Sequence, residues 1–383
     1  MLYFDIAMPL TLLAVVTVAM LLNKRVAGRL ESTLEEKEFQ TRDVVLLVVF
    51  MAVVISAITY ISIINPGAVF ENALLVIFLS SYTMLLFTIS FVFANLPKAR
   101  AQLVSVGFGV ASAVAGFACM LGPLQDAYTT IRVVAFFGLT AFCIGVIVFE
   151  QLKTYSKPKW YVAVQPPAIF VLLFVFLNFI NNSGTAAVWF PVVMDIFGLT
   201  FAVLIILYLS SLFSWKTVGL FAVLLTGLDI VLVFSGPMVK AASTFTGLGL
   251  PVLVYLPNVP LFPYTGAQNI FGFAPVGLGL GDFFFAGVLA VQTFNKFGQK
   301  IAFAAVIAMT IAFGIWESAL PTLFNVLSPI LGHQLTGFPG TLMILTGWAP
   351  VVGWKLLSEK RKGAKPAVGT TSEVSKEQNL PVQ

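Results

Sequence analysis

Three aspartates lie inside long apolar stretches of this 383-residue chain, where a charged side chain is costly. Asp195, Asp229 and Asp282 each fall within a run of residues that can cross a lipid bilayer. A carboxylate at the centre of a membrane-spanning helix costs about 2.5–3.5 kcal/mol on insertion scales, so such residues usually have a function or a specific partner. Glu150 and Glu317 lie near the ends of apolar runs, and we expect them to reach the membrane interface.

Asp229 and Asp282 belong to consecutive apolar runs, 217–235 and 277–294, which are antiparallel across a long connection. Asp229 lies about 18 Å along its run at 1.5 Å per residue, and Asp282 lies near the start of the next, so both fall in the same half of the membrane. Two carboxylates that meet in an apolar environment cannot both ionise easily, and one keeps a proton. The charged one can take a proton from water while its partner polarises a carbonyl, which is the chemistry of peptide hydrolysis.

Three glycines, Gly277, Gly279 and Gly281, alternate immediately before Asp282. Glycine weakens the start of a helix and lets another backbone approach closely. Small residues also allow helices to pack tightly in a membrane, and for glycines alone we favour that interpretation. Glycines that lead directly to an intramembrane aspartate indicate a site.

The elements that position these residues must be membrane helices. Hydrophobic residues make up 59% of the chain and charged residues 10%, whereas a soluble domain has about 25% charged residues. The apolar runs approach the roughly 20 residues that a spanning helix needs and exceed the strands of a barrel. We therefore predict an all-α, polytopic transmembrane helix bundle of about nine to eleven spans. Eleven spans are expected, at 6–22, 44–64, 73–94, 103–122, 133–149, 161–180, 187–213, 217–235, 277–294, 301–320 and 339–356.

Basic residues fall after every second expected span, in short loops. Examples are Lys24, Arg25, Lys98, Lys153, Lys216, Lys296 and Lys355. The positive-inside rule then predicts a multi-pass protein of a plasma membrane or an internal membrane, with the N-terminus outside and the C-terminus in the cytoplasm. The net charge of +5 is explained by this pattern, and we expect contact with the lipid bilayer and not with nucleic acid. Cys119 and Cys143 lie inside apolar runs and are expected to be buried thiols.

The chain divides by composition into three parts. Residues 1–213 hold transmembrane helices without a recognisable motif, 214–357 hold the helices of the aspartate pair, and 358–383 are polar and expected to be a disordered cytoplasmic tail. The connection 236–276 is long, apolar and rich in proline, which suggests a segment in or on the membrane. Within it, the stretch 252–255 (VLVY) is expected to pair as a strand, either internally or with a bound peptide.

These residues resemble the presenilin and signal peptide peptidase family of intramembrane aspartyl proteases over about residues 217–356. The Gly-x-Gly-Asp element is matched in full by Gly279, Leu280, Gly281 and Asp282. The Tyr-Asp element corresponds to Leu228 and Asp229, with leucine in place of tyrosine. The Pro-Ala-Leu element is not intact. Its candidates are Pro339, Gly340, Thr341 and Leu342, which we favour by position, or Ala319, Leu320 and Pro321.

The resemblance is closest to the signal peptide peptidase branch, because of motif order, spacing and expected orientation. It implies a protease that cleaves transmembrane or signal-peptide helices with Asp229 and Asp282 as the catalytic pair. Leu228 and the segments 279–281 and 339–342 would then contact substrate or shape its groove. The family uses no metal and no cofactor, and this branch needs no obligatory accessory subunit. Eleven spans exceed the family's usual nine.

Two other functions remain open at this stage. An ion-coupled secondary transporter also uses broken helices and intramembrane carboxylates, and Asp195 would then belong to the relay. A family member without activity would bind transmembrane helices only. In the protease, Asp195 is instead a structural hydrogen-bonding group, with Asn178, Asn181 and Asn182 as candidate partners. His333 is the single histidine and is expected to be a solvated loop residue, so no metal site is predicted.

Overall fold

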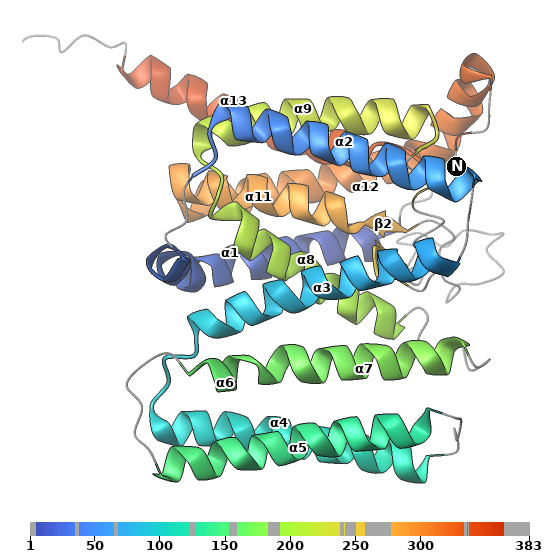
Figure 1. The fold of residues 1–383 in the computed structure, drawn as a ribbon. Helices are drawn as coiled ribbons and strands as arrows, with labels where there is room; N and C mark the ends of the chain where they lie inside the picture. The colour runs from blue at the N-terminus through green and yellow to red at the C-terminus, as the bar shows by residue number, and fades with distance from the viewer. Residues whose placement is uncertain are drawn as a thin grey trace, which may run out of the picture.

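The apolar segments fold into long helices that run along one common direction and form a bundle (Figure 1). The computed structural model describes residues 5–34, 38–64, 68–122, 128–152, 159–182, 192–237, 241, 250–256, 277–332, 335 and 337–363. Within these ranges, nine helices are long and apolar enough to cross a membrane. The chain is therefore a multi-pass membrane protein with an all-α fold, as predicted.

Each of the eleven expected spans coincides with a helix. In chain order these are α1 (Ala7–Leu34), α2 (Thr41–Ile64), α3 (Ala68–Val92), α4 (Lys98–Leu121), α5 (Thr129–Leu152), the short α6 (Trp160–Ala163) with α7 (Gln165–Asn182), α8 (Val192–Ser210), α9 (Trp215–Phe234), α11 (Leu280–Phe297), α12 (Gln299–Leu331) and α13 (Gly340–Gly363). Of the remaining helices, α11 is less apolar than a typical span. The cause is its polar residues, of which Gln292 and Thr293 are buried among the surrounding helices.

Two helices extend beyond their expected ends. The proline at 321 does not end α12, which continues to Leu331 and bends away from the bundle in its last turns (Figure 1). A proline inside a helix removes one hydrogen bond and kinks the axis, and the helix can continue beyond it. Glu317 consequently lies in the interior of α12 and not near its end. At the C-terminus, α13 reaches Gly363, and the i, i+4 ion pair of Lys355 with Glu359 at 3.2 Å supports this extension.

A two-stranded antiparallel sheet connects the second half of the bundle. β1 (Leu253–Val254) pairs with β2 (Leu278–Gly279), with Leu253 opposite Gly279 and Val254 opposite Leu278. The stretch 252–255 therefore pairs internally, which is one of the two alternatives expected for it. Residues 238–240, 242–249 and 257–276 of the long connection lie outside the described residues.

One hydrophobic core joins both halves of the chain. It contains side chains of α1, α8, α9, α11 and α13, among others, and so crosses the expected boundary at residues 213 and 214. The helix α11 is at its centre, because every residue from Phe283 to Thr293 is buried. Gly287 permits this packing, since a Cβ at that position would come 2.5 Å from Cγ1 of Ile206 on α8.

The antiparallel pair α4 and α5 lies at the edge of the bundle, beyond α7 (Figure 1). We refer to α4 and α5 as the hairpin. Small side chains of α4 face α5, and both thiols, Cys119 and Cys143, are buried as expected. Glu150 does not reach the interface, contrary to expectation. It is completely buried and bonds both Lys159 and Tyr161.

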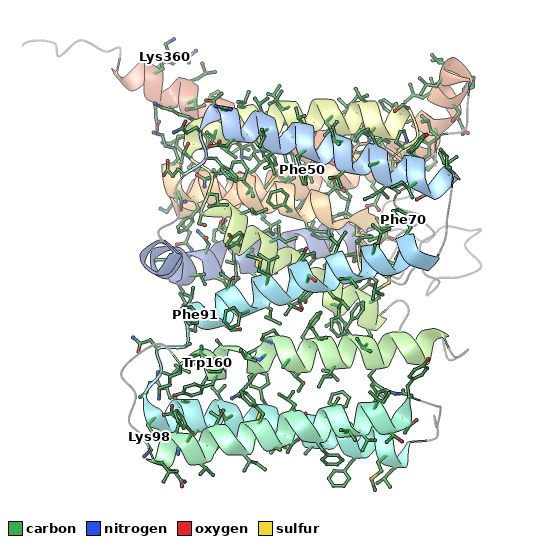
Figure 2. All side chains as sticks on the ribbon, in the orientation of Figure 1. Phe50, Phe70, Phe91, Lys98, Trp160 and Lys360 are labelled. Atoms are coloured by element: carbon green, nitrogen blue, oxygen red, sulfur yellow. The ribbon has the colours of Figure 1, made fainter. Side chains whose placement is uncertain are left out.

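The bundle has one basic end. Figure 2 shows Lys98 and Lys360 at the same end of the helices, and α9, α11 and α12 place Lys216, Lys296 and Lys300 at their termini on that side. We call it the basic end. The sheet lies toward the opposite end (Figure 1).

Candidate active site

The helix α9 carries Asp229 on its buried face. Ser214 caps the helix with a capping box, in which its hydroxyl and that of Thr217 each bond the other's backbone N–H. The buried face then includes Leu225, Thr226 and Asp229, and the side chain of Asp229 is only 8% exposed. The hydroxyl of Thr226, one turn before Asp229, is buried and has no hydrogen-bond partner among the described residues.

The helix α11 carries Asp282 in its first turn. Strand β2 leads directly into this helix, and Gly279 is its N-cap residue. The backbone of Gly279 lies against the carboxylate of Asp282, because a Cβ at Gly279 would come 3.2 Å from Oδ2 of Asp282. The partial positive charge of a helix N-terminus also favours a carboxylate at this position. Asp282 as a whole residue is half-buried.

The first two residues of α13 contact both aspartates. The hydroxyl of Thr341 donates to Oδ2 of Asp229 at 2.6 Å, and its backbone N–H donates to the same atom at 3.3 Å. The neighbouring Gly340 lies against Asp282, because a Cβ at Gly340 would come 2.5 Å from the Asp282 Cγ. Because Gly340 and Thr341 are adjacent in the chain, the two carboxylates lie at the same end of α13. We call Asp229, Asp282, Gly340 and Thr341 the aspartate site.

The glycines before Asp282 have different surroundings. A Cβ at Gly277 would come 3.1 Å from the ring of Tyr255, and one at Gly279 would come 3.2 Å from Oδ2 of Asp282. At these two positions, glycine therefore lets other atoms of the protein approach the backbone closely. Gly281 is exposed, with no neighbouring atom within 4 Å of the place of a Cβ, so its backbone is open beside Asp282.

The other predicted site residues surround these contacts. Pro339 is buried and precedes α13, where its carbonyl accepts the N–H of Met343 at 3.4 Å. Leu228 and Leu280 pack in the hydrophobic core, and Leu342 is half-buried. The alternative segment 319–321 lies inside α12. The contacts with the aspartates come from Gly340 and Thr341, in the segment favoured by position.

Asp195 has a partner that the sequence analysis missed. Its Oδ1 accepts the backbone N–H of Tyr255 at 2.9 Å, immediately after strand β1. The side chains of the expected partners Asn178, Asn181 and Asn182, and the whole of His333, lie outside what the structure describes. The signal available in the sequence was the expected strand at 252–255, whose outer edge needs an acceptor for its N–H groups.

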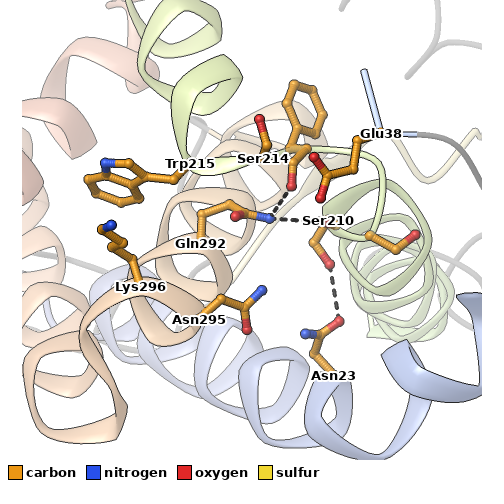
Figure 3. A pocket seen from close by; sticks show the side chains of 10 residues that line it. Asn23, Glu38, Ser210, Ser214, Trp215, Gln292, Asn295 and Lys296 are labelled. Carbon is orange, nitrogen blue, oxygen red and sulfur yellow. Dashed lines mark hydrogen bonds between the residues drawn. The ribbon is translucent and has the colours of Figure 1, made fainter. Parts of the chain in front are cut away.

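A cavity of about 230 Å³ lies at the basic end, away from the aspartate site (Figure 3). Its polar lining includes Asn23, Glu38, Gln292 and Lys296. Gln292 donates to the carbonyls of Ser210 and Phe213 at 2.8 and 2.6 Å, and Ser210 donates to Asn23 at 3.2 Å. These bonds hold α1, α11 and the turn between α8 and α9 together. The cavity therefore lies where three elements are tied to one another, at the other end of α11 from Asp282.

Neither a metal centre nor a known relative identifies the site. Within the described part of the chain, no group of three or more His, Cys, Asp or Glu residues is arranged to hold a metal ion. Comparison of the chain with protein-family models, with curated proteins and with solved structures gives no match.

Proposed function

We propose that the protein is an intramembrane aspartyl protease that hydrolyses peptide bonds within transmembrane or signal-peptide helices. One observation carries the proposal: consecutive residues at the start of α13 contact Asp229 and Asp282, so two carboxylates from different helices meet within the bundle. Carboxylates paired in an apolar environment share a proton, which is what acid–base hydrolysis requires. The resemblance of residues 279–282 to the Gly-x-Gly-Asp element supports the same function.

The reaction needs no group beyond the two aspartates and water. The charged carboxylate takes a proton from water as the water oxygen attacks the scissile carbonyl carbon. The protonated carboxyl hydrogen-bonds the carbonyl oxygen and stabilises the charge that develops there. A proton then passes to the amide nitrogen, the C–N bond breaks, and a carboxylic acid and an amine result.

The surroundings of the aspartate site suit this reaction. The open backbone at Gly281 leaves room for a substrate chain beside Asp282. The buried hydroxyl of Thr226 offers a polar group that can hold a water molecule one turn from Asp229. In the expected orientation, the basic end faces the cytoplasm and the aspartate site lies in the outer half of the membrane. We expect no obligatory accessory subunit.

The proposal is tested by cleavage of a labelled transmembrane peptide by the purified full-length protein in detergent. Asp229→Asn and Asp282→Asn should each lower the rate by about 10²- to 10⁴-fold, because each removes one half of the acid–base pair. Unchanged helical content and an unchanged Tm would show that both variants are folded. Cleavage that persists in either variant would exclude the paired-aspartate mechanism.

The competing carrier function gives a different result. In an ion-coupled transporter, Asp195 would matter as much as Asp229, and flux into proteoliposomes would follow a proton or sodium gradient. A protein that only binds helices would retain the substrate peptide in all variants and cleave it in none. Absence of cleavage by the wild-type protein across several helical peptides would favour these alternatives.

A further inference from the structure

Asp195 is a buried carboxylate in the first turn of α8 that the proposed reaction does not use. Its side chain is only 6% exposed, and its Oδ1 accepts the N–H of Tyr255 at 2.9 Å. A buried carboxylate that bonds a backbone group in a membrane protein satisfies a donor that lipid cannot satisfy. The question is what this bond holds in place.

The N–H of Tyr255 points away from the sheet. Leu280 donates its N–H to the carbonyl of Val252 at 2.9 Å, so these two residues form a hydrogen-bonded pair of the ladder. Bonded and non-bonded pairs alternate along antiparallel strands, so Leu253 and Tyr255 belong to non-bonded pairs. The N–H of Tyr255 therefore faces away from β2. Asp195 therefore supplies the acceptor at the outer edge of β1, where no third strand is present in the described residues.

The helix α8 also contacts Pro251, which lies shortly before β1. A Cβ at Gly198 would come 3.1 Å from the carbonyl oxygen of Pro251, so only glycine allows this approach without displacement. Gly198 lies one turn after Asp195 on α8. The helix thus contacts the segment 251–255 at two points, at Pro251 before β1 and at Tyr255 after it.

This segment in turn determines where α11 begins. Leu253 pairs with Gly279 and Val254 with Leu278, and Gly279 is the N-cap of α11 and lies against the carboxylate of Asp282. A continuous series of contacts therefore leads from α8 through β1 and β2 to Asp282. Each step is a backbone contact or a hydrogen bond, which leaves little freedom for the position of the carboxylate.

We propose that Asp195 is a positioning residue for Asp282, acting through Tyr255 and the two-stranded sheet as a hydrogen-bond acceptor. This inference rests on the proposed protease function. The role requires the acceptor oxygen of Asp195 and not its charge or its ability to carry a proton. Asparagine retains that oxygen with the same geometry, whereas alanine removes it.

The test compares Asp195→Asn with Asp195→Ala in peptide cleavage by the full-length protein. Asp195→Ala should lower kcat by about 10- to 100-fold, because misplacement of a catalytic group by about 1 Å has an effect of this size. Its KM should stay within about threefold of the wild type, because the lost interaction acts in the transition state. Asp195→Asn should keep most of the activity and the pH profile of the wild type.

Hydrogen–deuterium exchange provides a measurement that does not depend on proteolysis. Peptides that cover residues 250–256 should exchange faster in Asp195→Ala and at the wild-type rate in Asp195→Asn, while α4 and α5 keep their protection in both variants. Asp195→Asn as inactive as Asp195→Ala would overturn the inference, because a charge or proton would then be required. Unchanged exchange and unchanged kcat in Asp195→Ala would also overturn it.

The two measurements separate this inference from the proposed function. If the wild-type protein cleaves no peptide, the protease proposal fails and Asp195 cannot position a catalytic residue. Exchange in 250–256 then still decides whether Asp195 holds the strand. If the wild-type protein cleaves and Asp195→Ala loses protection without losing kcat, the strand is held but the effect on Asp282 is refuted.

Discussion

The hairpin and the core around α11 are both made of apolar helices, yet they bury their side chains in different ways. In α5, buried residues recur every three or four positions from Thr129 to Glu150 and form one stripe, while the other residues are exposed or half-buried. In α11, burial is continuous from Phe283 to Thr293. The hairpin therefore suits contact with lipid, whereas α11 is enclosed by other helices.

Polar groups differ between these two regions in the same way. In the hairpin, Ser112 donates to the carbonyl of Phe136 at 2.7 Å, and Glu150 is matched by Lys159 and Tyr161. At the aspartate site, Asp282 remains half-buried beside the open backbone of Gly281. Polar groups that are fully paired inside a membrane hold structure together, and those left open are available for chemistry.

Substitution of one glycine in each region should produce the largest difference in cleavage rate between the two regions. Gly340→Ala places a methyl group 2.5 Å from Cγ of Asp282, so the carboxylate must move and cleavage should fall by about 10²-fold or more. Gly116→Ala in α4 would bring a Cβ 3.2 Å from Phe137, and should cost stability of about 1–3 kcal/mol without changing kcat. Cleavage rates and Tm values of both variants check this contrast. Equal activity of the two would argue that Gly340 does not shape the site.

The hydroxyl of Thr341 should have the next largest effect. Thr341→Val removes the 2.6 Å bond to Asp229, and a hydrogen bond to a charged group contributes about 1.5–3 kcal/mol, so kcat should fall by about 10- to 100-fold. Thr341→Ser keeps the hydroxyl and serves as the matched control, with activity close to wild type. If Thr341→Val keeps the kcat of the wild type, the hydrogen bond does not matter for catalysis.

The ion pair beside the hairpin should affect stability and leave catalysis unchanged. Lys159→Met leaves Glu150 buried without its cation, which costs about 3–5 kcal/mol, whereas Glu150→Leu combined with Lys159→Met should recover most of that loss. Thermal unfolding in detergent measures the loss, and kcat of the folded protein should equal that of the wild type. A decrease in kcat at full folding would mean that the hairpin is coupled to the aspartate site.

The sequence predicted which segments form helices, but it predicted few of the contacts between them. The expected spans coincide with helices because about 20 apolar residues in lipid have few alternatives to an α-helix. The expected span 301–320 ended too early, because α12 continues through Pro321 to Leu331 with a bend. Glu150 was misplaced because its partners Lys159 and Tyr161 follow a turn, and only packing brings them back to α5.

The sequence by itself determined that this chain is a bundle of membrane helices and that three aspartates lie within it, because composition and hydrophobic length are local properties. Only the tertiary structure decided which groups meet. Thr341 lies more than a hundred residues from Asp229 along the chain and contacts it through helix packing, Gly340 lies against Asp282 in the same way, and Asp195 reaches Tyr255 across the sheet edge. Such contacts depend on the relative positions of helices, which no local pattern of residues specifies.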